Sequence, residues 1–141
     1  RTWWSRAADS AGPPPDTASL AGAIRRLDQA ATDWEAARDA ALAGPVNRRA
    51  LSASNERLRQ VERALTRPEG LSGRPWLRNL IFASDRDNGY ADVAFPSIVE
   101  AWRAGDADLT REETADLVDR LADAATRLAE AAAAVRPSSP Q

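Results

Sequence analysis

The sequence predicts an all-α fold. Three long stretches place apolar residues at steps of three and four, the spacing that gathers side chains on one face of an α-helix. Each stretch ends close to a Gly or a Pro, where helices commonly stop. The length of 141 residues fits one domain, and a domain of that size buries roughly two thirds of the surface of its unfolded chain. We expect the helical domain at residues 17–136, between an N-terminal tail or linker at 1–16 and a C-terminal tail at 137–141.

The first helix is expected to begin at Thr17, because Asp16 or Thr17 can accept a hydrogen bond from the free amides of a first helical turn. We expect it to end before Gly44 and Pro45, because Gly and Pro commonly follow the last turn of a helix. Ahead of it, the prolines at 13–15 favour extended polyproline geometry. The apolar stripe of this helix consists of Leu20, Ile24, Leu27, Ala31, Trp34 and Ala41.

Two further long helices follow the same rule. The second carries the stripe Leu51, Ser54, Leu58, Val61 and Leu65 and stops before Pro68. The last is expected to open at Thr110, because Glu113 follows it at the spacing of a capping box, and to end before Pro137. Its stripe consists of Leu117, Leu121, Ala124, Leu128, Ala131 and Val135.

A long connection at residues 71–105 separates the second helix from the last. We expect it to be irregular except for one short helix at Pro96–Arg103. Connections of this length are uncommon in compact domains and are often functional. This one holds Trp76, Phe82, Tyr90, Phe95 and Trp102. The adjacent Trp3 and Trp4 lie in the N-terminal tail, and we expect them to pack against the helical domain.

Composition excludes several classes of function. Histidine and cysteine are absent, so the commonest general base and the thiolate nucleophile are both missing. We therefore expect no catalytic residue, no metal and no cofactor in this chain. Its 19 basic residues are all arginine and are outnumbered by 21 acidic ones, which disfavours binding to nucleic acid. No apolar run approaches the roughly 20 residues that span a bilayer, so no membrane contact is expected for this stretch.

Two acidic groups have structural explanations. The string Asp85-Arg-Asp-Asn-Gly89 resembles the start of an EF-hand calcium loop, but its glycine comes one position early and Pro96 occupies the place of the final glutamate ligand. A solvated turn is the better interpretation. Glu112 and Glu113 would lie in the first turn of the last helix, where negative charge complements the helix dipole.

Other polar side chains lie in or beside the connection. Arg74 and Arg78 flank Trp76 and are expected to have structural roles. Asp106 is expected in the loop before the last helix. For Tyr90, the single tyrosine, two interpretations stay open: a packed ring with a satisfied hydroxyl, or an outward-facing hydrogen-bond donor.

The stretch from residue 55 to 102 contains, in one order, the segments Glu-Arg-Ala, Pro-Glu-Gly-Leu, Arg-Pro-Trp and Phe-Pro. This order resembles the C-terminal, transferrin-receptor-like dimerisation domain of the glutamate carboxypeptidase II (prostate-specific membrane antigen) family of zinc peptidases. The flanking helices are similar to that domain in length and amphipathic pattern.

The resemblance implies a four-helix bundle that follows a peptidase domain and forms a homodimer with its own copy. The parent protein would be a zinc-dependent metallopeptidase of the carboxypeptidase or aminopeptidase type, with its zinc ligands in the peptidase domain. The loop Asn88-Gly89-Tyr90 would contribute to the substrate pocket of that domain. Gly89 stands where the family has a lysine, so the charge partner of a C-terminal glutamate is missing here. The family implies an exported or extracellular protein, while the residues leave the compartment undetermined.

A two-fold dimer requires a self-complementary patch. We expect this patch on the last and first helices, at small residues that allow close approach, Ala124, Ala125, Ala131 and Ala132, together with Leu128. The chain starts with arginine and has no methionine, so we expect it to be part of a longer protein. The alternative function is a stand-alone helical module that binds a protein or ligand in a groove of the aromatic connection. A hydrolase that acts alone through carboxylates and Tyr90 has the least support.

Overall fold

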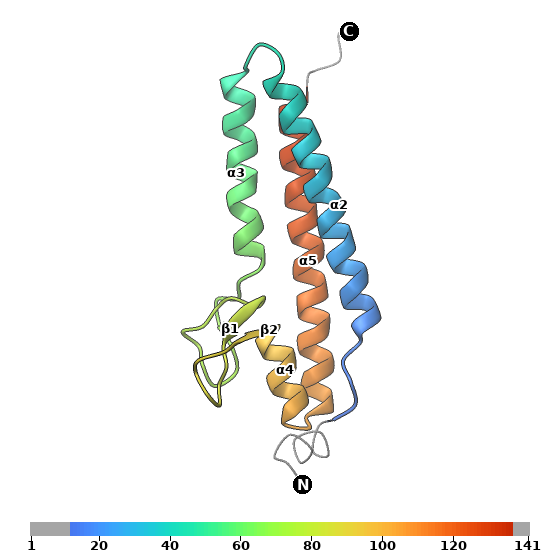
Figure 1. Cartoon of the computed structure of the whole chain (residues 1–141), viewed down its shortest axis with the longest axis vertical. Coiled ribbons are helices and arrows are strands. Elements are labelled where there is room, and N and C mark those ends of the chain that lie inside the picture. The colour runs from blue at the N-terminus through green and yellow to red at the C-terminus, as the bar shows by residue number, and fades with distance from the viewer. Residues whose placement is uncertain (1–11, 137–141) are drawn as a thin grey trace. The chain divides into compact units, whose positions relative to one another are not determined.

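The structure is a computed structural model that describes residues 12–136. The expectations for Trp3, Trp4 and the tail at 137–141 lie outside the described residues. The all-α prediction is confirmed, because the described chain is mostly helical and its two strands have three residues each. In chain order the elements are α2 (Thr17–Leu42), α3 (Arg48–Ala64), β1 (Phe82–Ser84), β2 (Asp92–Ala94), α4 (Pro96–Arg103) and α5 (Ala107–Val135) (Figure 1).

The chain divides into two compact units. Among the described residues, the first comprises 12–21 and 65–119, and the second comprises 22–64 and 120–136. The boundaries fall inside α2 and α5, so each of these two helices contributes residues to both units. All elements of the connection, including the strands and α4, belong to the first unit.

Small side chains form the core of the second unit, where α2, α3 and α5 pack together (Figure 1). A polar contact at this core joins α2 to α3: the indole nitrogen of Trp34 donates to the hydroxyl of the buried Ser54 at 3.2 Å. Alanines at facing positions let helix backbones approach closely, so few large side chains are needed. The cluster consists of Ala37, Ala132 and Val135, with Trp34, Ala41 and Leu51 packed against it.

The predicted apolar stripes are confirmed for α5 and only partly for α2. All six residues of the α5 stripe are buried. On α2, Leu20, Ala23 and Ala37 are buried, but Ile24 of the predicted stripe is 41% exposed. The buried face of α2 is therefore rotated toward its alanines, because an alanine can sit closer to a neighbouring helix than an isoleucine.

The predicted start of the last helix is wrong by one turn. α5 begins at Ala107, and the Oδ1 atom of Asp106 accepts a hydrogen bond from the amide of Leu109 at 2.9 Å. Asp106 is thus the N-cap instead of Thr110, which agrees with the stronger preference for Asp over Thr at this position. Glu113 consequently lies beyond the first turn and serves another purpose.

Glu113 is the partner of a largely buried arginine. Its two carboxylate oxygens accept hydrogen bonds from the guanidinium of Arg67 at 2.8 and 3.1 Å, and the side chains of Arg67 and Glu113 are 16% and 8% exposed. Arg67 also donates to the carbonyl of Gly70 at 3.1 Å and approaches Asp116 at 3.3 Å. The hydrogen bond with Glu113 raises the pKa of Arg67 above its usual value. Removing one partner from a buried pair leaves the other charge uncompensated and costs about 3–5 kcal/mol.

The connection at 71–105 contains the predicted short helix, α4, with its bounds as expected. The rest was expected to be irregular, but it also forms an antiparallel pair of strands. β1 and β2 pair with Phe82 opposite Ala94, Ala83 opposite Val93 and Ser84 opposite Asp92. Three-residue strands are too short to display the alternation by which strands are recognised in a sequence. Between these strands lies the loop that carries Tyr90.

A close backbone approach explains the glycine of the Pro-Glu-Gly-Leu segment. Gly70 has a φ of 71°, and a Cβ atom added there would lie 2.2 Å from the carbonyl oxygen of Pro75. Gly73 has the same φ of 71°, but a Cβ atom there would meet nothing within 4 Å. The two glycines thus share one backbone conformation and differ in the space around them.

We expect Gly70→Ala to destabilise the chain more than Gly73→Ala. Both substitutions place a Cβ in the left-handed region, at a cost of about 1–2 kcal/mol, but only Gly70→Ala adds a clash with backbone atoms, which costs about 1–3 kcal/mol more. Urea unfolding of the two variants measures the difference, with Gly73→Ala as the matched control. Equal losses of stability would show that the turn at Gly70 relaxes away from Pro75.

Candidate functional site

The loop between β1 and β2 brings the three predicted substrate-binding residues together. Tyr90 is fully exposed, with 101% of its reference surface accessible. The packed interpretation of this tyrosine is therefore wrong, and its role as a hydrogen-bond donor stays a prediction. Asn88 and Gly89 directly precede it, and Gly89 has a φ of 66°, a conformation that favours glycine.

Hydrogen bonds within the loop hold its backbone in one conformation. The side-chain oxygen of Asn88 accepts from the amides of Tyr90 and Ala91 at 2.9 and 3.1 Å. The amide of Gly89 donates to the carbonyl of Asp85 at 3.0 Å, and the amide of Asp85 donates to the carbonyl of Ala91 at 2.7 Å. Asn88 therefore shapes the backbone under Tyr90, and its own side-chain oxygen is already engaged by that backbone.

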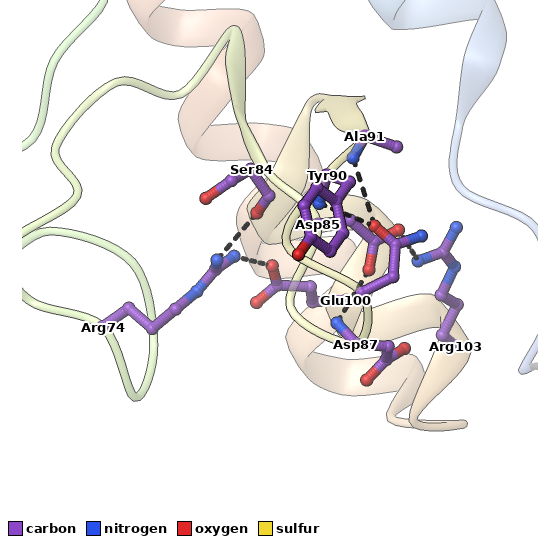
Figure 2. Close-up of polar contacts among 9 residues, drawn as sticks. Arg74, Ser84, Asp85, Asp87, Tyr90, Ala91, Glu100 and Arg103 are labelled. Atoms are coloured by element: carbon purple, nitrogen blue, oxygen red, sulfur yellow. Dashed lines mark hydrogen bonds and ion pairs between the residues drawn. The ribbon is translucent and has the colours of Figure 1, made fainter.

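Asp85 connects this loop to α4 (Figure 2). One of its carboxylate oxygens accepts from the amide of Asp87 at 2.8 Å, and the other lies 3.4 Å from a guanidinium nitrogen of Arg103. The hydrogen bond from Asp87 is the largest cause of a lowered pKa of Asp85, and Arg103 lowers that pKa further. Burial acts in the opposite direction but is outweighed. The string that resembles a calcium loop is thus an Asp-centred turn, as expected.

Arg74 makes a second connection at the start of the loop. One guanidinium nitrogen donates to the carbonyl of Ser84 at 2.8 Å, and the other contacts the carboxylate of Glu100 on α4. The side chains of Arg74 and Glu100 are 12% and 14% exposed. Arg74 has the structural role that was predicted for it, whereas Arg78 is exposed.

Comparison with known proteins assigns the chain to a family. Residues 16–129 match the model of the transferrin receptor-like dimerisation domain. The chain belongs to this family. A relative in Arabidopsis thaliana, the probable glutamate carboxypeptidase LAMP1, is 35% identical over 86 residues, which are 61% of this chain and 12% of the relative. The chain thus corresponds to a small part of that protein's length. The resemblance inferred from the residues is confirmed.

The predicted interface residues of this dimerisation domain occupy mostly buried positions. Ala124, Leu128, Ala131 and Ala132 are each at most 8% exposed within the single chain, and Ala125 is half-buried. The four buried residues face the chain's own helices and offer little surface to a partner. The position of the dimer interface stays a prediction, and of the five residues Ala125 is the one that a second copy could reach.

The aromatic connection of this dimerisation domain exposes large side chains and borders a hollow of about 560 Å³ beside the turn at residues 69–75. Trp76 and Phe82 are 72% and 57% exposed. A hollow of about 430 Å³ lies elsewhere in the first unit, where the prolines at 13–15 face Thr110, Thr114 and Val118 of α5. Within residues 12–136, no group of acidic side chains has an arrangement that could hold a metal ion. Nor does any helix of the described chain have the length and hydropathy needed to cross a bilayer.

Sequence reasoning missed the residues that hold the loop. Glu100 and Arg103 lie on α4, and their partners Arg74 and Asp85 are 26 and 18 residues away in the chain. No spacing rule links an arginine to an acid at such separations. The sequence does contain one signal that could have indicated them: Glu100 and Arg103 lie one turn apart on a predicted short helix next to the loop.

We expect the Asp85 carboxyl to titrate below its ordinary pKa of 3.8. Because its folded pKa is lowered, its contribution to stability is present above pH 3.8 and is lost as the pH falls through the folded value. The check is an NMR titration that follows the Asp85 carboxyl carbon and the Asp87 amide. A carboxyl that titrates at or above 3.8, with the Asp87 amide shift unchanged, would contradict the assigned hydrogen bond.

Proposed function

We propose that this domain pairs two copies of a longer, peptidase-like protein and presents Tyr90 to the substrate pocket of its peptidase domain. Membership of a dimerisation-domain family supports the first role. The match to a probable glutamate carboxypeptidase, of which the chain covers 12%, supports the second. The proposed polypeptide is a zinc-dependent hydrolase whose zinc and catalytic groups belong to the peptidase domain. This chain has no His or Cys, the residues that most often bind zinc.

The pairing surface should contain exposed or half-buried residues of the helices. Ala125 on α5 is half-buried, and Ile24 on α2 is 41% exposed. Leu42 and Val46 are 50% and 52% exposed near the end of α2. A small side chain such as Ala125 admits close contact with a partner helix, and exposed aliphatic side chains supply the apolar area that a stable interface needs.

The exposure of Tyr90 is the observation that carries the pocket role. An aromatic side chain with 101% accessibility gains nothing from the chain's own packing. Its loop, however, is held in one conformation by Asn88 and Asp85. Because the loop backbone is already ordered, it loses no further conformational entropy when the phenol donates a hydrogen bond to a peptide. Gly89 adds no charge beside it, so the proposed contact is a hydrogen bond to the peptide rather than an ion pair with a C-terminal glutamate.

For the pairing role we expect the chain to form a dimer whose dissociation constant rises by about tenfold or more in Ala125→Glu, because the substitution buries an unpaired charge at the contact. Ala133→Glu is the matched control, since Ala133 is an exposed alanine on the same helix. Sedimentation equilibrium over a wide concentration range measures both. A monomer at every concentration would contradict pairing by this chain and would favour the binding-module alternative. Equal effects of the two variants would place the interface elsewhere.

For the pocket role we expect Tyr90→Phe, made in the polypeptide that joins this domain to its peptidase, to raise KM for peptide substrates by about tenfold with little change in kcat. The reason is that the lost hydrogen bond holds the substrate in both the ground state and the transition state. Steady-state kinetics check it, with Arg111→Gln on the exposed start of α5 as the control. Unchanged KM in Tyr90→Phe would remove the pocket role and leave the pairing role intact.

A further inference from the structure

Tyr90 contacts a ligand usefully only if its loop has a definite position, and the loop's internal hydrogen bonds do not provide one. The bonds made by Asn88 and by the amides of Asp85 and Gly89 fix the shape of the loop. They do not fix where the loop lies relative to the rest of the first unit, because both partners of each bond are within residues 85–91. The position must come from contacts that leave the loop.

Two side-chain contacts attach the hairpin to α4, one from Asp85 in the loop and one through Arg74 at Ser84, directly before the loop, and they are unequal. Asp85 meets Arg103 at 3.4 Å, but the Arg103 side chain is 45% exposed, so water and salt screen that attraction. Arg74 and Glu100 are 12% and 14% exposed, and their contact is screened much less. Arg74 also holds the carbonyl of Ser84, the last residue of β1 and the residue before Asp85.

We infer that Arg74 is the positioning residue of the Tyr90 loop. Its guanidinium joins the end of β1, through the Ser84 carbonyl, to α4, through the carboxylate of Glu100 (Figure 2). Arg74 does not act on a ligand directly. It fixes the position of Ser84, the residue that directly precedes the loop. The inference rests on the proposed function only for the assumption that Tyr90 contacts a ligand.

The chemistry of the arginine side chain is what this connection requires. Two different nitrogens of one planar group reach two acceptors on different elements, which a lysine ammonium with its single nitrogen reproduces poorly. The third nitrogen, Nε, is buried and has no hydrogen-bond partner among the described residues. Burying an unsatisfied donor costs free energy, so this arginine is held by its two terminal contacts and not by a fully satisfied site.

Tyr90 offers a direct readout because it is the single tyrosine of the chain. Incorporation of 3-fluorotyrosine therefore yields one ¹⁹F resonance, whose shift and width report the surroundings and motion of this side chain. Hydrogen exchange at the Asp85 amide, which donates to the Ala91 carbonyl at 2.7 Å, reports the base of the loop. Neither signal depends on a peptidase domain.

The experiment compares Arg74→Lys and Arg74→Gln with Arg67→Lys in the full 141-residue chain. Arg67 is a matched control because it is also a largely buried arginine that binds a carbonyl and a carboxylate in the same unit. We expect all three variants to lower the urea midpoint. Only the Arg74 variants should shift or broaden the ¹⁹F signal and speed exchange at Asp85 by about tenfold, the effect of losing one hydrogen bond, with Gln acting more strongly than Lys.

The inference is overturned if the Arg74 variants lose stability as Arg67→Lys does while the Tyr90 resonance and Asp85 exchange stay as in the parent chain. Should Arg74→Gln fail to fold, Arg74→Lys and Glu100→Gln carry the same test. Kinetics in the peptidase-containing polypeptide separate the two proposals. If Arg74→Lys moves the ¹⁹F signal and Tyr90→Phe leaves KM unchanged, the positioning role stands and the pocket role fails.

Discussion

The ion pair between Arg67 and Glu113 is the contact on which the first unit depends. It attaches the turn at residues 66–71 to α5 and is mostly shielded from water. With that turn in place, the amide of Leu71 reaches the carbonyl of Leu77, and the amide of Leu80 reaches that of Leu65. Leu71 and Leu80 are then buried. This fold-back belongs to the same unit as the hairpin, whose loop is attached separately through Arg74.

The chain uses arginine wherever one cation must satisfy several acceptors. Arg67 binds a carboxylate with two nitrogens and a carbonyl with the third, and Arg74 joins a carbonyl to a carboxylate. All 19 basic residues are arginines, and Arg67 and Arg74 make these contacts in largely buried positions. Exposed pairs such as Arg111 with Asp108 contribute at most about 1 kcal/mol each. The second unit relies instead on close contacts among alanines, together with the Trp34–Ser54 hydrogen bond between α2 and α3 and an exposed ion pair between Arg57 and Glu130.

These two strategies match the two proposed roles. The close-packed helices can carry a pairing surface on their exposed side. The ion pairs of the connection hold the loop that exposes Tyr90. A domain without histidine or cysteine can in this way shape the pocket of a catalytic domain without supplying a catalytic group. Gly89 has a left-handed backbone conformation, and the side chain of Tyr90 beside it is fully exposed.

Periodicity and punctuation in the sequence were enough to predict the all-α class, the buried stripe of α5 and the bounds of α4, because a helix is determined by residues three and four apart. The Glu-Arg-Ala, Pro-Glu-Gly-Leu, Arg-Pro-Trp and Phe-Pro segments, in that order, were enough to indicate the family. The rotation of α2 toward its alanines and the burial of Ala131 and Ala132 depended on which helix surfaces meet. The partners Arg67–Glu113 and Arg74–Glu100 are 46 and 26 residues apart. Only the tertiary structure decides such pairs, because an ion pair between distant residues leaves no spacing in the sequence.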